Sequence, residues 1–298
     1  MRENMIYIVT AMYAEAHALI NRFQLKKDIS HTRFQVFLNR EADICLFISG
    51  TGLVPAAAAV SSICTEYGAG QGDFLLNIGI CGQIWNKNGQ VERNACQTGR
   101  IFLCSKIREL SAGKTFYPDI LYRHGFDEAQ IITGQKPYDK SAPAQMEGTD
   151  FFLYDMEAAA VYQAGAYYFG PHQMSFLKVV SDDGNAADVT PAQIEKLIDN
   201  NRERLADYIA RLKAVGCGEH QDGFMEDAEK KAAYEKLCAD MHCSRTMRES
   251  LRQYLCYHAL SGADYAPILE EMYREGKLPC TDKREGKQCF EELKKRLL

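Results

Sequence analysis

Apolar residues in the first two thirds of the chain form short runs, each followed by a polar or glycine-containing loop and a helical pattern. Met5 to Val9 is one such run, and Ala11 to Phe23 follows it with apolar positions near helical spacing. Further strand-like runs are Ile44 to Ser49, Phe74 to Ile78, Arg100 to Ile107 and Ser175 to Val180. This alternation predicts an α/β fold over residues 1–216, with a mixed or parallel sheet covered by helices.

Helix and turn signals divide this region further. Pro55 stands where it can begin an alanine-rich helix that Gly68 ends, and Asp155 to Phe169 forms a helical pattern before Gly170-Pro171. Thr190-Pro191-Ala192-Gln193 has the form of a capping box and opens one long amphipathic helix through Leu212. The same reasoning makes Gly79 to Gly82 the end of a strand and Ser181 to Gly184 a turn.

After Val215 the composition changes. Residues 216–223 are polar and broken by glycines, and the segment beyond them contains helix formers with little strand signal. We therefore predict a domain boundary there, with residues 1–216 as one domain and residues 217–298 as a small helical domain of unknown role. Its apolar anchors would pack three or four helices together.

Composition narrows the class of protein. Hydrophobic residues make up 46% of the chain and charged residues 25%, and no apolar stretch has the roughly 18 residues that a membrane span requires. The first residues lead directly into a strand-like run without the pattern of a cleavable signal, so we expect a cytoplasmic protein. A net charge of -5 gives no general attraction to nucleic acid or anionic membranes. The expected partner is a small molecule.

The cysteines suggest two chemical alternatives. The chain has 11 of them without the dense spacing of a secreted disulfide scaffold, which predicts reduced and mostly buried thiols. Cys81, between two glycines, could instead be a nucleophile with a histidine as its base. Metal ligands could come from the tail, but the pattern lacks a Cys-x-x-Cys pair and the prediction is that no metal is bound. The tail residues are Cys238, His242, Cys243, Cys256, His258, Cys280 and Cys289.

Five short motifs follow one another along the chain in a specific order. They are Thr10-Ala11-Met12-Tyr13-Ala14-Glu15, Ser49-Gly50-Thr51-Gly52, Asn77-Ile78-Gly79-Ile80-Cys81-Gly82, Met156-Glu157-Ala158-Ala159 and Val180-Ser181-Asp182. In this order they resemble the motifs of the nucleoside phosphorylase/nucleosidase superfamily, which has the purine and uridine phosphorylase fold. The chain is most similar to methylthioadenosine/S-adenosylhomocysteine nucleosidases, because an acid lies three residues after an Ala-Met pair. The resemblance covers about residues 5 to 213.

The resemblance implies cleavage of the N-glycosidic bond of a purine-type nucleoside, with a role for each motif. Asp182 would assist the departing base at N7, Glu15 would position the attacking water, and Glu157 would accept hydrogen bonds from the ribose hydroxyls. Met156 would pack on the sugar. The remaining substrate-site residues that the resemblance implies are Gly52, Gly79, Ile80, Tyr138 and Ser181. Each acid also has a structural interpretation: Asp182 as a turn residue, Glu157 as a first-turn helix acid and Glu15 as a solvent-facing helix acid.

Two other functions stay open at this stage. A phosphorylase would use phosphate as co-substrate and needs backbone donors with an arginine. The Gly50-Thr51-Gly52 loop supplies such donors, but Asn77-Ile78 stands where the family has its arginine, so Arg33 or Arg40 would have to serve. A non-catalytic nucleoside sensor is the second alternative, favoured by Ile80, where the family has serine or threonine. The resemblance also implies a homo-oligomer, a place in purine salvage and no cofactor.

Overall fold

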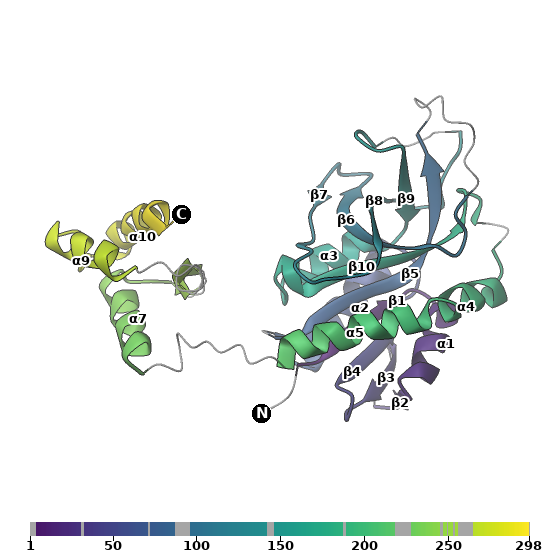
Figure 1. Ribbon diagram of the computed structural model, residues 1–298, viewed down its shortest axis with the longest axis horizontal. Helices are drawn as coiled ribbons and strands as arrows, with labels where there is room; N and C mark the ends of the chain where they lie inside the picture. The colour runs from purple at the N-terminus through teal and green to yellow at the C-terminus, as the bar shows by residue number, and fades with distance from the viewer. Residues whose placement is uncertain are drawn as a thin grey trace. The chain divides into compact units, whose positions relative to one another are not determined.

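The structure is a computed structural model that describes residues 4–30, 33–70, 72–86, 96–141, 146–186, 189–217, 228–244, 247–248, 250–252, 254–255 and 265–297. The chain divides into two compact units, Met1–Cys217 and Gly218–Leu298. Figure 1 shows a sheet and helices in the first unit and helices in the second.

The first unit is a sheet covered by helices, which confirms the predicted α/β class. Its strands are β1 (Ile6–Thr10), β2 (Lys26–Asp28), β3 (Gln35–Asn39), β4 (Ile44–Ile48), β5 (Phe74–Trp85), β6 (Ile101–Glu109), β7 (Thr115–Phe116), β8 (Asp127–Thr133), β9 (Phe151–Asp155) and β10 (Met174–Asp182). Its helices are α1 (Tyr13–Arg22), α2 (Leu53–Glu66), α3 (Ala158–Gly165), the 3-10 turn η1 (Pro171–Gln173), α4 (Pro191–Asp199) and α5 (Arg202–Cys217).

Alternating strand residues build a core on each face of the sheet. Ile6 and Ile8 of β1 pack in a layer with residues of α1, α4 and α5. Their neighbours Tyr7 and Val9 pack in the opposite layer, with residues of α2 and α3. Successive side chains of a strand point to opposite faces, so an uninterrupted apolar run is buried on both sides. The helices cover both faces of the sheet in Figure 1.

Strand direction gathers several loops at one edge of the sheet. β1 lies between β4 and β5 and is parallel to both, and β5 is also parallel to β10. The loops after Thr10, Ile48 and Asp182 therefore leave the sheet at the same edge, where open α/β sheets bind ligands. β5 also pairs with β9, and through β8, β6 and β10 these strands close into a ring.

Three predicted boundaries are wrong. β5 does not end at Gly79 but runs on to Trp85, because it continues to pair with β10 as far as Gly82 and with β9 from Gly82 to Trp85. Asp155 ends strand β9, and the helix α3 begins only at Ala158. The long helix after the Thr190 capping box is two helices, α4 and α5. The side chain of Asn201, between them, donates to the carbonyls of Gly99 and Leu197.

The second unit contains the helices α7 (Ala228–Asp240), α9 (Ala266–Arg274) and α10 (Lys283–Leu297) among its described residues. They enclose a separate apolar core that includes Leu237, Met241, Met272 and Leu293, all at most 2% exposed. Because this core is made only of residues from this unit, its helices have a packing surface of their own. Among the described residues of the chain, no helix has the length and apolar character that crossing a membrane requires.

A candidate nucleoside site along strand β5

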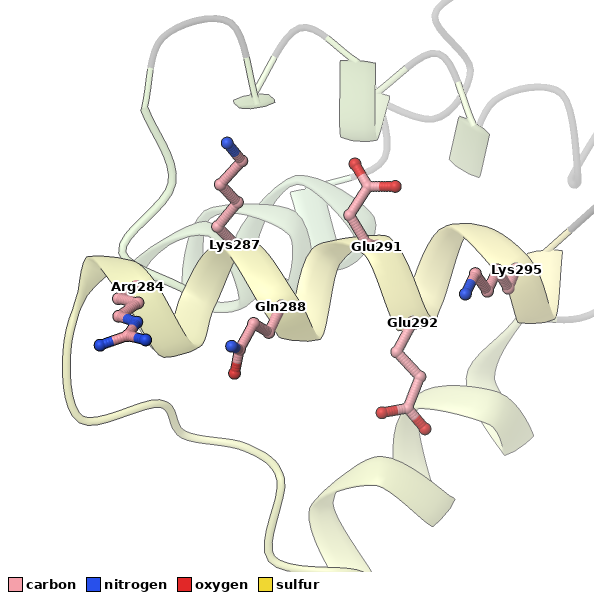
Figure 2. Close-up of a pocket in the computed structure, with 6 residues that line it drawn as sticks. All are labelled: Arg284, Lys287, Gln288, Glu291, Glu292 and Lys295. Carbon is pink, nitrogen blue, oxygen red and sulfur yellow. The ribbon is translucent and has the colours of Figure 1, made fainter.

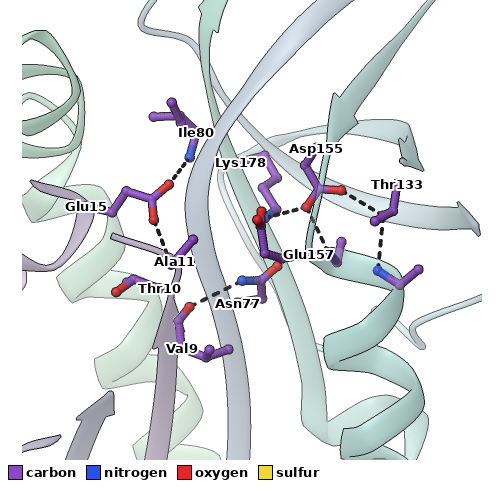
Figure 3. Close-up of polar contacts among 12 residues, drawn as sticks. Val9, Thr10, Ala11, Glu15, Asn77, Ile80, Thr133, Asp155, Glu157 and Lys178 are labelled. Carbon is purple, nitrogen blue, oxygen red and sulfur yellow. Dashed lines mark hydrogen bonds and ion pairs between the residues drawn. The ribbon is translucent and has the colours of Figure 1, made fainter. Parts of the chain in front are cut away.

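Glu15 is buried at the start of α1, where the chain turns back from strand β1. It is 2% exposed, and its Oε2 atom accepts hydrogen bonds from the backbone N–H groups of Ala11 (2.8 Å) and Met12 (3.0 Å). The other oxygen, Oε1, accepts from the N–H of Ile80 at 2.9 Å. A carboxylate in the first turn of a helix is also favoured by the helix dipole. Glu15 therefore lies against β5 (Figure 3). It is not the solvent-facing helix acid that the structural interpretation expected.

Gly79 gives the Glu15 carboxylate its space. A Cβ atom at this position would lie 2.7 Å from Glu15 Oε1, closer than real Cβ contacts allow. The glycine in this strand is thus explained by the close approach of a side chain and not by a turn. Ile80, the next residue, is half-buried and supplies the N–H group that holds the carboxylate.

Glu157 stands at the junction between β9 and α3 and reaches another helix. It is the N-cap residue of α3, and not a first-turn acid, and its Oε1 accepts from the N–H of Gly52 at 2.7 Å. Gly52 precedes α2 with a φ of 103°, a left-handed conformation that glycine adopts without strain. The Glu157 carboxylate therefore binds at the N-terminal end of α2, where backbone N–H groups are unpaired.

A buried lysine, which none of the sequence motifs contains, offsets the negative charge of these acids. Lys178 of β10 is 1% exposed, and its Nζ lies 2.8 Å from Oδ2 of Asp155. Burial lowers its pKa, but the charges of Asp155, Glu157 and Glu15 outweigh burial and raise the pKa above the ordinary value. Lys178 therefore stays protonated among three carboxyl groups (Figure 3). The sequence does carry a signal for this residue, because a lysine inside an apolar strand run is rarely buried unless it has a charged partner.

Burial and charge also act on the two glutamates. Burial raises the pKa of Glu157 to about 7, and Asp155 adds to this, while Lys178 and the Gly52 N–H lower it. Burial likewise raises the pKa of Glu15 above its ordinary value, against its hydrogen bonds and Lys178. Near neutral pH Glu157 is thus present in both protonation states, which is the condition under which a carboxyl group exchanges protons readily.

Asp155 and Asn77 complete the buried cluster in different ways. Asp155 accepts from the hydroxyl of Thr133 (2.7 Å) and the N–H of Ala158 (2.8 Å), so its position is fixed from two elements. Asn77 donates through Nδ2 to the carbonyl of Val9 at 3.3 Å, but its buried Oδ1 has no hydrogen-bond partner among the described residues. Leaving a buried acceptor unpaired costs about 1–3 kcal/mol, so Asn77 offers an acceptor to a ligand or water.

Asp182 marks the other end of the site, at the end of β10. The strand has an irregular register between Val180 and Asp182, and Asp182 lies opposite Gly82. Its Oδ1 accepts from the N–H of Gly184 at 2.8 Å, and its Oδ2 from the hydroxyl of Ser181 at 2.6 Å. Asp182 is only half-buried. Ser181 and Asp182 therefore belong to the strand end, and the predicted turn follows them.

Strand β5 lies against two of the three predicted acids. Glu15 contacts it at Gly79 and Asp182 at Gly82, where a Cβ atom would lie 3.2 Å from Asp182 Oδ1. Gly79 and Gly82 are three residues apart, which corresponds to about 10 Å of strand. The thiol of Cys81, between these points, is influenced by the charges of both Lys178 and Asp182. Glu15 and Asp182 are thus both brought to strand β5, while Glu157 reaches the start of α2.

The remaining predicted site residues flank these acids. Tyr138 is half-buried, packs edge-to-face on Tyr154 with ring centroids 5.1 Å apart, and lies against Gly184, just after Asp182. A Cβ on Gly184 would be 2.8 Å from Tyr138 Cδ1. Met156 is half-buried and precedes Glu157. Tyr138 therefore lies at the Asp182 end, and Met156 at the Glu157 end.

Comparisons with known proteins find a likeness in structure and none in sequence. No protein family model and no curated protein matches the sequence. A 5'-methylthioadenosine/S-adenosylhomocysteine nucleosidase of Neisseria meningitidis superimposes with a TM-score of 0.53 at 19% identity, over 70% of this chain and 99% of the other. The chain has the fold of the nucleosidases. The Arabidopsis thaliana 5'-methylthioadenosine nucleosidase gives 0.55 at 18% identity over 74% and 98%, and the Helicobacter pylori futalosine hydrolase 0.51 at 15% over 70% and 97%.

The structure gives less support to two other sequence-based alternatives, a Cys81 nucleophile and a metal site in the tail. Cys81 is buried, and burial raises its pKa well above that of an ordinary thiol, so it is not poised as a nucleophile. Of the tail residues proposed as metal ligands, Cys256 and His258 lie outside the described residues. Within the described part of the chain, no three histidine, cysteine or acidic side chains are arranged to hold a metal ion.

Two surface cavities involve none of the predicted site residues. One, of about 170 Å³, is lined by residues that include Phe126 and Arg204 of the first unit. The other, of about 610 Å³, lies along α10 and is lined by Arg284, Lys287, Gln288, Glu291, Glu292 and Lys295. Figure 2 shows these side chains pointing in different directions from the helix, with cations and anions interspersed. They resemble a solvated helix face more than a ligand site.

Proposed function

We propose that the unit Met1–Cys217 hydrolyses the N-glycosidic bond of a purine-type nucleoside. The observation that carries this proposal is the burial of Glu15 and Glu157, whose charges help keep Lys178 protonated, with Glu15 and Asp182 both lying against β5. Glycosidic cleavage builds positive charge on the ribose and negative charge on the departing base. Carboxylates beside the sugar would stabilise its positive charge. A hydrogen-bonding acid at the base would stabilise the negative charge there.

Glu15 and Glu157 would act on the sugar side. A buried carboxylate that is held by backbone N–H groups keeps a fixed position, and Glu15 would use its remaining acceptor capacity to orient the attacking water. Glu157 accepts only one hydrogen bond from the described residues, from Gly52, so its second oxygen is available to ribose hydroxyls. Met156, next to Glu157, would pack against the sugar ring.

Asp182 would act at the base. Its carboxyl group is half-buried at a strand end and is oriented by Ser181 and Gly184, which leaves it accessible to a purine N7 atom. A hydrogen bond or proton delivered to N7 makes the base a better leaving group. Tyr138 packs beside the loop that follows Asp182 and would border the base.

Water is favoured over phosphate as the nucleophile by the way the backbone donors are used. Phosphate binding at the N-terminal end of α2 would need the N–H of Gly52, but this group donates to Glu157. The N–H groups of Ala11, Met12 and Ile80 donate to Glu15. A phosphate dianion would therefore displace or face carboxylates, whereas water accepts and donates hydrogen bonds without charge repulsion.

The titratable groups also support water activation. Near neutral pH Glu157 is partly protonated, and Lys178 is positively charged beside it. Glu157 can therefore gain or lose a proton while the positive charge of Lys178 stays in place beside it. The products would be a free base and a ribose derivative, which would suit a role in purine salvage.

The decisive experiment offers methylthioadenosine, adenosylhomocysteine, futalosine, adenosine and inosine to the full chain, with and without phosphate, and detects the free base. We expect base release without phosphate. Asp182→Asn should lower kcat by about 10²–10⁴, the range for a general acid. Asp183→Asn is the matched control: this neighbour is exposed, pairs with Lys140 at 3.1 Å and should not affect turnover.

The same assay separates the alternatives. Base release that requires phosphate, with ribose 1-phosphate as the second product, would show a phosphorylase. Tight nucleoside binding without turnover would indicate a sensor. Equal release by wild type and Asp182→Asn would remove Asp182 from the mechanism, even if the chain is a hydrolase.

A further inference from the structure

The end of helix α7 brings two cysteines together. The N–H of His242 donates to the carbonyl of Ala239, and the N–H of Cys243 to the carbonyl of Cys238, both at 3.0 Å. His242, with a φ of 48°, has the left-handed conformation that ends this pattern. This is a Schellman cap, in which the residue just beyond the left-handed position contacts the residue five positions earlier. Here both contacting residues are cysteines.

The two thiols interact directly and differ in exposure. The thiol of Cys243 hydrogen-bonds to the sulfur of Cys238. Cys238 is 1% exposed, in the core of the second unit, whereas Cys243 is half-buried and offers the pair a path to solvent. The cap fixes the backbone on both sides of the pair, so the sulfurs are held in contact without help from a distant segment.

Neighbouring groups favour a thiolate at this pair. The hydrogen bond from Cys243 lowers the pKa of Cys238 to about 7 against the effect of burial, and Tyr234 and Arg248 lower it further. Glu235 acts in the opposite sense, but it is paired with the Arg248 guanidinium at 2.8 Å. A thiol with these surroundings is partly ionised near neutral pH, and the thiolate is the reactive form.

A second cysteine pair in the same unit also has a direct thiol–thiol hydrogen bond, but neither of its thiols has a lowered pKa. Cys280 and Cys289 both donate to the carbonyl of Lys277, at 3.6 and 3.4 Å. Both are buried at 6% exposure. Burial raises the pKa of Cys280, and raises that of Cys289 to about 12. This pair is therefore an internal control, because it belongs to the same apolar core but its thiols do not have a lowered pKa.

We infer that Cys238 and Cys243 form a reversible disulfide when the protein meets a hydroperoxide. A thiolate of the pair attacks one peroxide oxygen, so that a sulfur–oxygen bond forms, the oxygen–oxygen bond breaks and hydroxide leaves. The second sulfur then attacks this sulfenic sulfur, the disulfide forms, and the hydroxyl group leaves as water with the second thiol's proton. In sum, two thiols and hydrogen peroxide give a disulfide and two waters.

The test treats the full chain with hydrogen peroxide near neutral pH, blocks the remaining thiols and maps every cysteine by mass spectrometry. We expect the peptide with both Cys238 and Cys243 to lose two hydrogen atoms. Its oxidation should be on the order of tenfold faster than any change at Cys289, because of the larger thiolate fraction. A small-molecule dithiol should restore both thiols.

Variants sharpen the assignment. Cys243→Ser should stop the reaction at a sulfenic acid on Cys238, which a sulfenic-acid probe would label, whereas the double variant Cys280→Ser/Cys289→Ser should leave the disulfide unchanged. The inference is overturned if peroxide leaves this pair reduced, if Cys280 or Cys289 oxidises first, or if either sulfur bonds a different cysteine. Wild-type mapping suffices for this decision, even if a variant fails to fold.

Discussion

The two ends of the candidate site hold their carboxyl groups by different means. At the buried end, Glu15 and Glu157 are fixed by backbone N–H groups and surround the ammonium of Lys178. At the other end, Asp182 is half-buried and is oriented by one hydroxyl and one N–H group. Under the proposed function, this difference means that the sugar end is preorganised by the fold, while the base end depends on the ligand to complete its surroundings.

This comparison predicts that removing a charge at the buried end lowers the stability of the fold, whereas removing a charge near the exposed end changes stability little. Lys178→Met leaves Asp155 and two glutamates without their cation, and losing one partner of a buried pair costs about 3–5 kcal/mol. Urea unfolding measures this loss. Lys140→Met, which breaks the exposed pair with Asp183, should change stability by less than about 1 kcal/mol. Equal effects of the two variants would contradict the comparison.

The second prediction uses the pH dependence of stability. The pKa of Glu157 in the folded state is raised to about 7, so the unfolded chain releases this proton first as pH rises. Stability should therefore fall between about pH 4 and pH 7 by roughly 3 kcal/mol from this group, and then level off. Glu157→Gln keeps an acceptor for Gly52 and should remove this part of the slope. Urea unfolding of wild type and Glu157→Gln across this pH range measures the two slopes. If stability changed equally with pH in both proteins, Glu157 would not be the group responsible.

The third prediction tests the space that Gly79 provides. Gly79→Ala would place a Cβ atom against Glu15 and push the carboxylate away from its position. A displacement of about 1 Å can cost up to roughly 100-fold in rate, so we expect kcat to fall by about tenfold or more. Gly70→Ala is the control, because nothing lies within 4 Å of its added Cβ. Unchanged kinetics in the Gly79 variant would mean that the exact position of Glu15 is not needed.

The smallest effect is expected at the exposed end. Tyr138→Leu removes a ring that packs beside the loop after Asp182, so KM should rise by about tenfold while kcat changes little. Tyr138→Phe keeps the ring and should behave like wild type. Steady-state kinetics with the best substrate of the panel would answer this. A large fall in kcat for Tyr138→Phe would instead give the hydroxyl a chemical role.

The sequence pattern predicted the fold well where burial is continuous. The apolar runs of β1, β4 and β10 give the strands, and the Thr190 capping box gives the start of α4. The pattern failed at Gly79, where glycine was interpreted as a strand end. It failed because the need for this glycine comes from the Glu15 carboxylate, 64 residues earlier in the chain, which local spacing cannot reveal.

The order of the motifs identified Glu15, Glu157 and Asp182 as candidate acids, since chain order and residue type are properties of the sequence. Only the tertiary structure decided which groups neutralise them. Lys178 becomes the buried cation because β10 lies beside β5, and Gly52 becomes a donor because α2 begins against Glu157, the N-cap residue of α3. Pairing of distant strands fixes these contacts, and charges interact through space whatever their separation along the chain.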